Sequence, residues 1–236
     1  MATLAEICQD ALTGIDGFGI PTTFVGNEEN QTAELTLSLA TQVARELTRK
    51  YKWQVLKKEH SFTTVNGQEG YDLPEDFQRF ANLTFWSESD RWPLIQVSNV
   101  GWRELKSGLI VSGIRFYFIV SGGKFRINPT PSSAYQIAFD YYSKNFALSS
   151  NGSDEKSEWT DDDDIWRLDP DLLTLGIRYR FRSRKGQPFA EDKADYIDAI
   201  RDALFDDTPK PVIDTGVVPR RDLLEANVPD GNWSMN

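Results

Sequence analysis

The sequence predicts an α+β protein: a bundle of about four helices with an inserted small antiparallel β-domain and an extended C-terminal tail. Three observations predict this fold. Apolar residues recur at helical spacing near both ends of the body, over 3–51 and 169–204. Between these regions, residues 54–148 alternate loosely with a period of two and contain turn signals. After residue 205, prolines and glycines interrupt every regular pattern.

Two helices are expected before residue 53. The first covers residues 3–13 and opens on Thr3 and Glu6, which are spaced as in a capping box. The second covers residues 30–51 and carries a long apolar stripe. Both apolar faces need a partner elsewhere in the chain, because such helices are marginal alone. The loop between them contains three further apolar anchors: Ile15, Phe18 and Ile20.

The β-domain has one strong turn signal, Asn66-Gly67. Both positions tolerate positive φ, so we expect a hairpin that joins residues 55–65 to a strand at 70–73. The other expected elements are two short strands around Asp90, a helix at 98–106, a second hairpin at 115–128 and a last strand at 135–142.

A helical hairpin is expected near the end of the body. Asp169 and Pro170 are typical of a helix start, and Gly186 is typical of a helix end. Pro188 then suits the opening of a second helix. Both helices have apolar faces that must be covered, and pairing them with the two N-terminal helices completes the predicted bundle.

These elements divide the chain into four parts. They are the first part of the bundle (1–53), the inserted β-domain (54–148), an acidic surface loop with the second part of the bundle (149–205) and an extended C-terminal arm (206–236). The arm is too apolar for a solvated linker, so we interpret it as lying on its own body or on a partner. Its apolar residues include Val212, Ile213, Val217, Val218, Leu223, Leu224 and Trp233.

Composition excludes several classes of protein. The net charge of −10 argues against a protein that grips nucleic acid, although a surface past which nucleic acid slides remains compatible with it. No apolar run is long enough to cross a membrane, so we expect no membrane partner. A single cysteine, Cys8, excludes an intramolecular disulfide.

The sequence singles out no catalytic, cofactor or metal site, so we predict that the protein is not an enzyme and needs no cofactor. His60 is the only histidine, and zinc needs about four suitable ligands. We interpret His60 as a partly exposed strand residue, and we find no phosphate-binding glycine loop. The run Asp161–Asp164 lacks the spacing of a calcium loop, which favours a solvated turn that caps the next helix.

One basic cluster stands out in this acidic chain. It complements the dipole of the predicted helix at 169–185, or it pairs with an acidic patch on another copy. Opposite patches on one chain allow head-to-tail contacts that close into rings. The candidate inter-subunit residues are Arg178, Arg182, Arg184 and Lys185 on one side and Asp161, Asp162, Asp163 and Asp164 on the other.

Four pieces of the sequence, in order and spacing, resemble the head-to-tail adaptor (connector) proteins of short-tailed double-stranded DNA phages. The resemblance covers roughly residues 1–205. The pieces are Ala44-Arg-Glu-Leu47 with Tyr51-Lys-Trp53, Phe62–Tyr71 with Leu73-Pro-Glu-Asp-Phe77, Ile127-Asn-Pro-Thr-Pro131 with Tyr142-Ser-Lys-Asn145, and Asp171–Gly176 with Lys185-Gly186 and Phe189-Ala-Glu-Asp192.

The resemblance implies a virion structural protein of the tail or neck, made in the host cytoplasm. Such a protein forms a homo-oligomeric ring, typically of about twelve copies, under the portal protein. The ring extends the DNA channel and gives a platform to a downstream tail or nozzle protein. The resemblance also implies that the C-terminal arm reaches the portal. We expect carboxylates rather than the basic cluster to line the channel, because an acidic wall repels DNA and avoids specific binding.

Two other functions stay open. A carbohydrate-binding or receptor-binding tail module would use the β-domain and its tryptophans as a platform, and it would bind glycans as a monomer. A cell-wall-degrading tail enzyme would need a pair of carboxylates, and its turnover would vanish on substitution of one of them. With 36 acidic residues, the sequence singles out no such pair.

Overall fold

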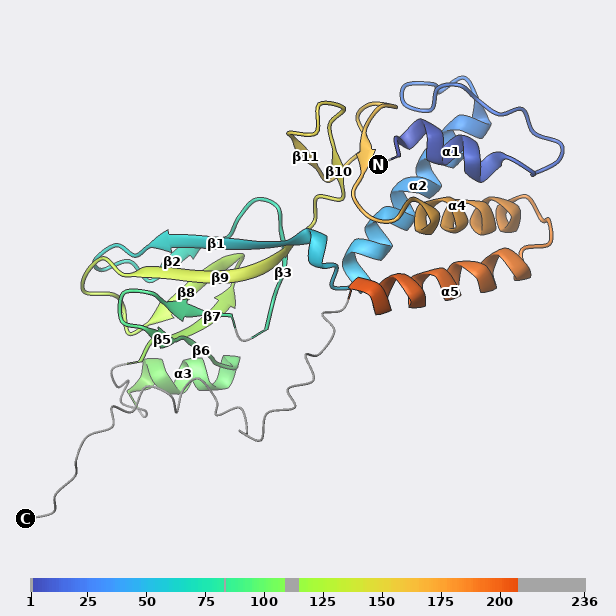
Figure 1. The fold of residues 1–236 in the computed structure, drawn as a ribbon. Coiled ribbons are helices and arrows are strands. Elements are labelled where there is room, and N and C mark those ends of the chain that lie inside the picture. Colours follow the sequence, from blue (N-terminus) through green and yellow to red (C-terminus); the bar gives the residue numbers. More distant parts are fainter. Residues whose placement is uncertain (1, 83, 109–114, 208–236) are drawn as a thin grey trace, which may run out of the picture.

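The computed structural model describes residues 2–82, 84–108 and 115–207, and it confirms the α+β class. Figure 1 shows α1, α2, α4 and α5 gathered at one end of the molecule, with the two larger sheets and α3 at the other. The helices are α1 (Leu4–Leu12), α2 (Gln31–Lys50), α3 (Asn99–Ser107), α4 (Pro170–Arg184) and α5 (Ala190–Asp207), with a 3-10 turn at Gln54–Leu56.

The strands fall into three sheets. The first has the order β1-β9-β4-β5 with β3 also paired to β9, the second the order β2-β8-β7-β6, and the third the order β11-β10-β12. Their bounds are β1 (Lys57–Thr63), β2 (Gly70–Asp72), β3 (Phe77–Phe80), β4 (Trp86–Ser87), β5 (Trp92–Pro93), β6 (Ile95–Gln96), β7 (Tyr117–Ser121), β8 (Lys124–Asn128), β9 (Gln136–Ser143), β10 (Ala147–Leu148), β11 (Glu155–Lys156) and β12 (Ile165–Trp166).

Local sequence signals start three of the helices. The capping box of Thr3 and Glu6 is present at the start of α1, the Asn30 side chain accepts from two backbone N–H groups at the start of α2, and Asp169 caps α4. Each cap satisfies amide groups that a helix start leaves without partners. Gly186 ends the α4 turn with a φ of 70°, as expected.

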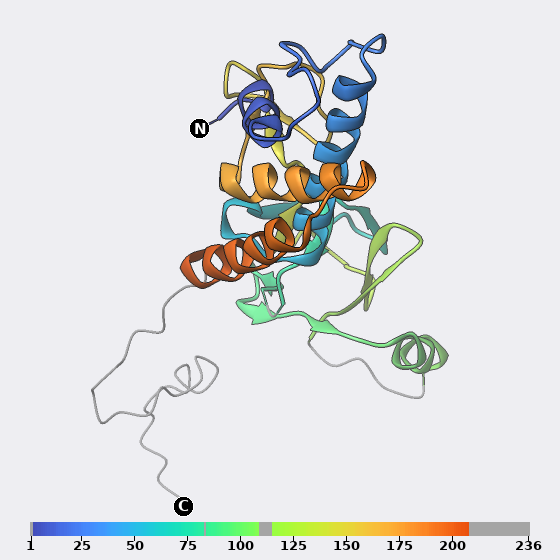
Figure 2. The ribbon, with the colours of Figure 1, turned by 90° about the vertical axis from the view of Figure 1, so that its right-hand side faces the viewer.

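Helix α4 is the centre of the helical core. It packs against α1, α2 and α5, and Figures 1 and 2 show it lying between α1 and α5. Its own buried residues meet apolar faces from both ends of the chain. The core includes Leu4, Ile7, Cys8, Leu39, Val43, Leu47, Leu172, Leu173, Ile177, Phe181, Tyr196 and Ile200.

A second core fills the space between the two larger sheets, and most of its buried residues are aromatic. Phe125 on β8 stacks on Phe139 on β9 at 5.5 Å between ring centroids, which joins the two sheets. Phe118 on β7 stacks on Phe125 at 4.7 Å. Large rings bury much apolar area each, so a few of them suffice for a small core. Helix α3 packs against β7, on the side of that sheet away from the rings (Figure 1).

The predicted hairpin at Asn66-Gly67 is wrong in its pairing, although the turn is present and Gly67 has a φ of 79°. β1 pairs with β9 and β2 pairs with β8, so the two flanking strands belong to different sheets. The Tyr71 hydroxyl accepts from the N–H of Val65 at 3.0 Å and donates to the carbonyl of Gln68 at 2.9 Å. These side-chain bonds take the place of a hairpin ladder.

Three smaller expectations are also corrected. The acidic segment 149–164 is not only a surface loop, because β10 pairs with β11 and β12 and Asp164 is fully buried. In the loop after α1, Ile15 is buried as expected, but Ile20 is 48% exposed and Phe24 is a buried anchor that was not predicted. Helix α5 begins at Ala190, two residues after Pro188.

Gly176 sets the distance between three helices. A β-carbon built on Gly176 of α4 would lie 2.7 Å from the Cγ1 atom of Val43 on α2 and 3.0 Å from the Cε2 atom of Tyr196 on α5. Both distances are below ordinary van der Waals contact. A side chain at this position would therefore push α2 or α5 away from α4.

We predict that Gly176→Ala lowers the free energy of unfolding by roughly 1–2 kcal/mol, because overpacking costs more than alanine's helix propensity returns. Urea denaturation followed by circular dichroism measures it. Gly101→Ala in α3 is the matched control, since its β-carbon would meet its nearest neighbour at 3.6 Å. An unchanged or raised stability of Gly176→Ala would show that the three helices are not in tight contact there.

Candidate functional site at the junction of the two cores

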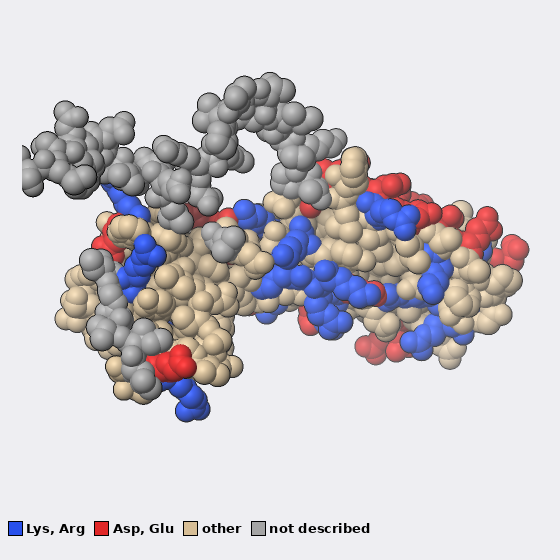
Figure 3. Space-filling model, turned by 90° about the horizontal axis from the view of Figure 1, so that it is seen from below, with Lys and Arg blue, Asp and Glu red and all other residues tan. Residues whose placement is uncertain are grey.

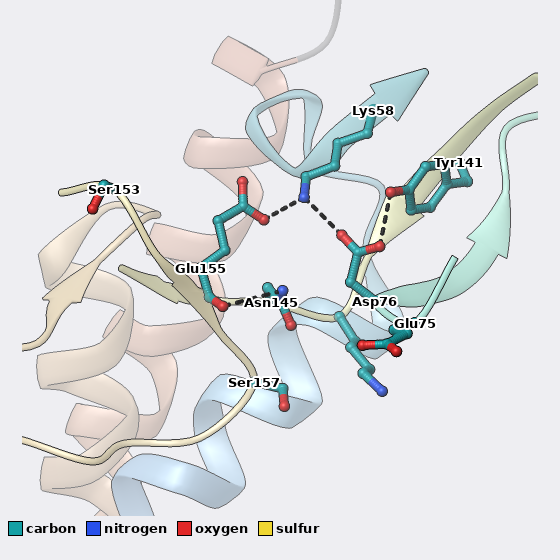
Figure 4. Close-up of a pocket in the computed structure, with 9 residues that line it drawn as sticks. Lys58, Glu75, Asp76, Tyr141, Asn145, Ser153, Glu155 and Ser157 are labelled. Carbon is teal, nitrogen blue, oxygen red and sulfur yellow. Dashed lines mark hydrogen bonds and ion pairs between the residues drawn. The ribbon is translucent and has the colours of Figure 1, made fainter. Parts of the chain in front are cut away.

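The largest concentration of paired charge lies where the β-domain meets the helical core. The chain crosses this junction near residues 56–58 and again near 143–147. A pocket of about 600 Å³ opens here (Figure 4). Its walls include Lys58 from β1, Asp76 from the turn before β3, Tyr141 from β9 and Glu155 from β11.

Lys58 connects the two sides of this pocket. Its ammonium lies 2.7 Å from the Oδ2 atom of Asp76 and also forms an ion pair with Glu155 (Figure 4). Asp76 accepts two further hydrogen bonds, from the hydroxyls of Tyr141 and Ser143, both at 2.8 Å. One lysine thus joins a carboxylate of the β-domain to a carboxylate of the small sheet beside the helices.

Arg167 extends the network into the helical part. Its Nη1 atom lies 3.2 Å from Glu155 and donates to the carbonyl of Asn145 at 3.1 Å. Its Nη2 atom donates to the carbonyl of Val55 at 2.9 Å. The guanidinium therefore holds both chain crossings at once. Such a fixed fork geometry is the property that distinguishes arginine from lysine at partly buried sites.

The surroundings of this pocket keep Asp76 and Lys58 charged and the Tyr141 hydroxyl protonated. Burial opposes the charge of Asp76, but hydrogen bonds from Lys58, Tyr141 and Ser143 outweigh it and hold the pKa of Asp76 below its usual value. Burial also opposes the charge of Lys58, but Asp76 and Glu155 outweigh it, so the pKa of Lys58 is raised. Burial and then the bond to Asp76 raise the pKa of Tyr141. This site suits permanent ion pairing rather than proton transfer near neutral pH.

His60 lies outside this pocket, and the prediction of a partly exposed strand histidine is confirmed. It sits on β1 with its ring 5.3 Å from the ring of Phe139, and burial lowers its pKa. Cys8 is buried in the helical core, where burial raises the pKa of its thiol. Within the described ranges, no group of three or more acidic, histidine or cysteine residues is placed to hold a metal ion. No helix in those ranges has the length and apolarity that a membrane span requires.

The acidic run caps a helix, but a different one from the helix expected. The carbonyls of Asp164 and Asp162 accept from the N–H groups of Leu4 and Ala5 at 2.8 and 3.0 Å, so the run closes the start of α1 rather than of α4. The Asp162 carboxylate accepts from the backbone N–H groups of Phe24 and Val25.

Asp164 is satisfied by Lys156, whose ammonium lies 2.6 Å away. It also accepts from the backbone N–H groups of Thr160 and Asp161. Hydrogen bonds and an ion pair of this kind make a buried carboxylate stable as an anion. Asp161 and Asp163 are exposed.

The basic cluster of α4 also has partners within the chain. Arg178 donates to the carbonyls of Asp10 and Ala11 at the end of α1, where the helix dipole favours a cation. Arg182 forms an ion pair with Asp192 on α5 at 2.9 Å. The Lys185 ammonium lies 4.9 Å from the ring centre of Phe18, and Arg184 is exposed.

Within the described residues, no ion pair joins the basic cluster to the acidic run. The role of these two patches between copies stays a prediction. The predicted portal-binding residues of the arm, from Val212 to Trp233, lie outside the described residues.

The sequence analysis did not identify the junction residues as a site. Two of the four pieces that carry the adaptor resemblance meet there, because Leu73–Phe77 contains Asp76 and Tyr142–Asn145 contains Ser143. The presence of Asp76 and Ser143 in two of these pieces was the signal in the sequence that could have located the site. Nothing in the local pattern showed that Lys58 and Glu155, almost a hundred residues apart in sequence, would be paired.

The chain belongs to the SU10 adaptor protein family, whose model matches residues 2–223. No curated protein matches the chain. Membership agrees with the resemblance to phage head-to-tail adaptors and places the chain among structural virion proteins that contact other phage proteins.

We predict that Asp76→Asn lowers the free energy of unfolding at pH 7 by about 1–3 kcal/mol, because Lys58 loses a partly buried charged partner. The folded pKa of Asp76 lies below its ordinary 3.8, so its stabilisation is full above that value and is lost as pH falls through the lowered pKa. The variant should therefore lose less stability than the wild type over this acidic window. Urea titrations at pH 7 and between pH 5 and about 2 measure both effects.

Asp72→Asn is the matched control for this prediction. The Asp72 side chain is 84% exposed and pairs with Lys124 at the surface, so its loss should change stability by less than about 0.5 kcal/mol. If the two variants had the same stability and the same acid profile, the junction would contribute no more than an ordinary surface pair.

Proposed function

We propose that this protein is a head-to-tail adaptor that forms a ring under the portal of a short-tailed phage. The ring extends the DNA channel and carries the next tail component. The observation that carries the proposal is the family match over residues 2–223, which includes both cores and the junction between them.

The subunit shape supports this role. Figures 1 and 2 show the helical part and the β-domain as two ends of one molecule, each with its own outer surface. The network of Lys58, Asp76, Glu155 and Arg167 holds these ends together. A subunit of this kind can contact one neighbour in the virion at each end and keep the spacing between them constant.

The net charge of the protein supports the proposed DNA channel. Each copy carries a net charge of −10, and an acidic wall repels the phosphate backbone of DNA. Arg178, Arg182 and Lys185 are held against α1, α5 and Phe18 within the subunit, which supports a channel lined by carboxylates instead.

The ring is proposed to contain about twelve copies, as is typical of the adaptors that the chain resembles. The C-terminal arm is proposed to reach the portal through its apolar residues. An arm of this composition is suited to a partner surface, because apolar side chains at an interface gain most when water is excluded from them.

One observation favours the alternative of a carbohydrate-binding module. Trp86 and Trp92, on the paired strands β4 and β5, are 39% and 44% exposed. Exposed indole rings stack on sugars, although Arg115 already lies 5.0 Å from the ring centre of Trp92. This function requires no assembly, so the experiment below separates it from the adaptor.

We predict that the purified protein, mixed with the portal protein of its phage, forms a defined ring complex. Native mass spectrometry of the adaptor alone, the portal alone and the mixture measures it. A protein that stays monomeric and ignores the portal would contradict the proposal. The glycan-binding alternative would then be tested with the same sample on immobilised cell-surface glycans.

We also predict that removing residues 208–236 leaves the body folded but abolishes portal docking. The cut is placed after Asp207, because its carboxylate accepts from the N–H of Gln54 and so belongs to the body. Circular dichroism and thermal melting check the fold, and native mass spectrometry checks docking. Undiminished docking by the truncated chain would show that the arm is not the portal contact.

A further inference from the structure

A groove lies on the outer face of the β2-β8-β7-β6 sheet, beside α3. It has a volume of about 710 Å³ and is lined by Trp102, Arg103 and Lys106 of α3, with Ile119 and Arg126 from the sheet. Ile119 and Arg126 are direct cross-strand partners. Their neighbours Phe118 and Phe125 point into the aromatic core, so alternation places Ile119 and Arg126 on the opposite face.

This groove is basic in an acidic chain. Its one acidic wall residue, Glu69, pairs with Lys106 at 2.6 Å. No carboxylate of the described residues lies within ion-pair distance of Arg103 or Arg126, and both are exposed. The Lys106 ammonium lies 5.6 Å from the ring centre of Trp102, so an aromatic ring lies beside the cations that line the groove. An acidic, partly apolar surface would complement it.

Helix α5 presents such a surface. Its buried residues Asp192, Tyr196 and Ile200 face the helical core. A different side of the same helix carries carboxylates spaced by four, three, four and four residues, which aligns them in one stripe. The stripe consists of Glu191, Asp195, Asp198, Asp202 and Asp206, all exposed.

The stripe is largely unneutralised. Asp198 pairs with Arg201 on the same helix, with both side chains more than 60% exposed, so that pair is weak. Within the part of the chain that the structure describes, no cation lies within ion-pair distance of Asp195 or Asp202. Ile197 on the same helix is 46% exposed and gives α5 an exposed apolar side chain as well.

Groove and stripe belong to opposite ends of the molecule. Figures 1 and 2 place α3 and α5 apart in both views. Figure 3 shows Asp and Glu side chains along the edges of the helical end, while Lys and Arg side chains are present on both ends of this face. The two surfaces of one copy therefore do not meet each other. A contact between two different surfaces of successive copies is heterologous, and a closed series of such contacts is a ring.

We propose that the α3 groove of one copy receives the acidic α5 stripe of the next copy. This inference rests on the proposed ring and names the surfaces that close it. It differs from pairing between the basic cluster of α4 and the acidic run at 161–164, because four residues of those patches already have partners within the chain: Arg178, Arg182, Asp162 and Asp164.

Charge exchange tests this contact. Arg103→Glu with Arg126→Glu reverses the groove, and Asp195→Lys with Asp202→Lys reverses the stripe. Each pair of changes sets like charges against each other in every contact of the ring, so assembly with the portal should need at least about tenfold more protein. The variant with all four changes restores opposite charges with their positions exchanged, and it should assemble like the wild type.

Native mass spectrometry of adaptor–portal mixtures over a series of protein concentrations gives the readout, with thermal melting to confirm that each variant is folded. The control matched to the groove variant is Arg49→Glu with Lys52→Glu, two exposed cations on and just after α2, which changes the net charge by the same amount as the groove variant. It should assemble like the wild type.

The outcomes separate the inference from the proposed function. Loss of the ring in both two-site variants with recovery in the four-site variant supports the contact. A wild type and a groove variant that assemble equally well overturn the contact while the adaptor role stands. Failure of the four-site variant to recover overturns it as well. A wild type that forms no ring with the portal contradicts both.

Discussion

The structure depends on the ion-pair network between its two cores. Among the residues that the structure describes, two cations form ion pairs with Glu155: Lys58 of β1 and Arg167. Lys58 also pairs with Asp76 of the β-domain. Partly buried ion pairs are a weak source of net stability, since removing charges from water costs free energy that their attraction must repay. Their geometry, however, tolerates little variation. The network is therefore better understood as what fixes the angle between the cores than as what keeps either core folded.

Other polar groups of the helical part work in the same way, by joining segments that are distant in sequence. Asp162 reaches back to Phe24 and Val25, and the carbonyls around it close the start of α1. Arg178 closes the other end of α1. The first helix is thus held at both ends by residues more than 150 positions later. Apolar packing on α4 alone would allow α1 to slide, whereas these bonds give it one position.

The parts of the fold that could be predicted from sequence were those with local signals. Each cap, at Thr3, Asn30 and Asp169, involves residues within one turn, and each stripe repeats every three or four residues, so these helices were predicted close to their observed bounds. Pairing between strands has no such local signal. Asn66-Gly67 predicted a turn correctly but not its partners, because Tyr71 satisfies the turn and frees its strands for two different sheets.

The ion pairs at the junction could not be predicted from the sequence for a related reason, because 36 acidic residues offer many possible partners for any lysine. The family resemblance found the general function without identifying the site, because its motifs mark places where the chain turns and packs.

The position of the β-domain within the chain has a consequence for how the protein is made. The aromatic core draws on one continuous stretch, from Phe62 to Tyr141, whereas the helical core needs both Leu4 and Ile200. Synthesis delivers the N-terminal end first, and domains fold as their last segment emerges. The middle of the protein is therefore complete before its ends. Helices α1 and α2 leave the ribosome early, with their apolar faces uncovered, and must wait for α4 before they can be buried.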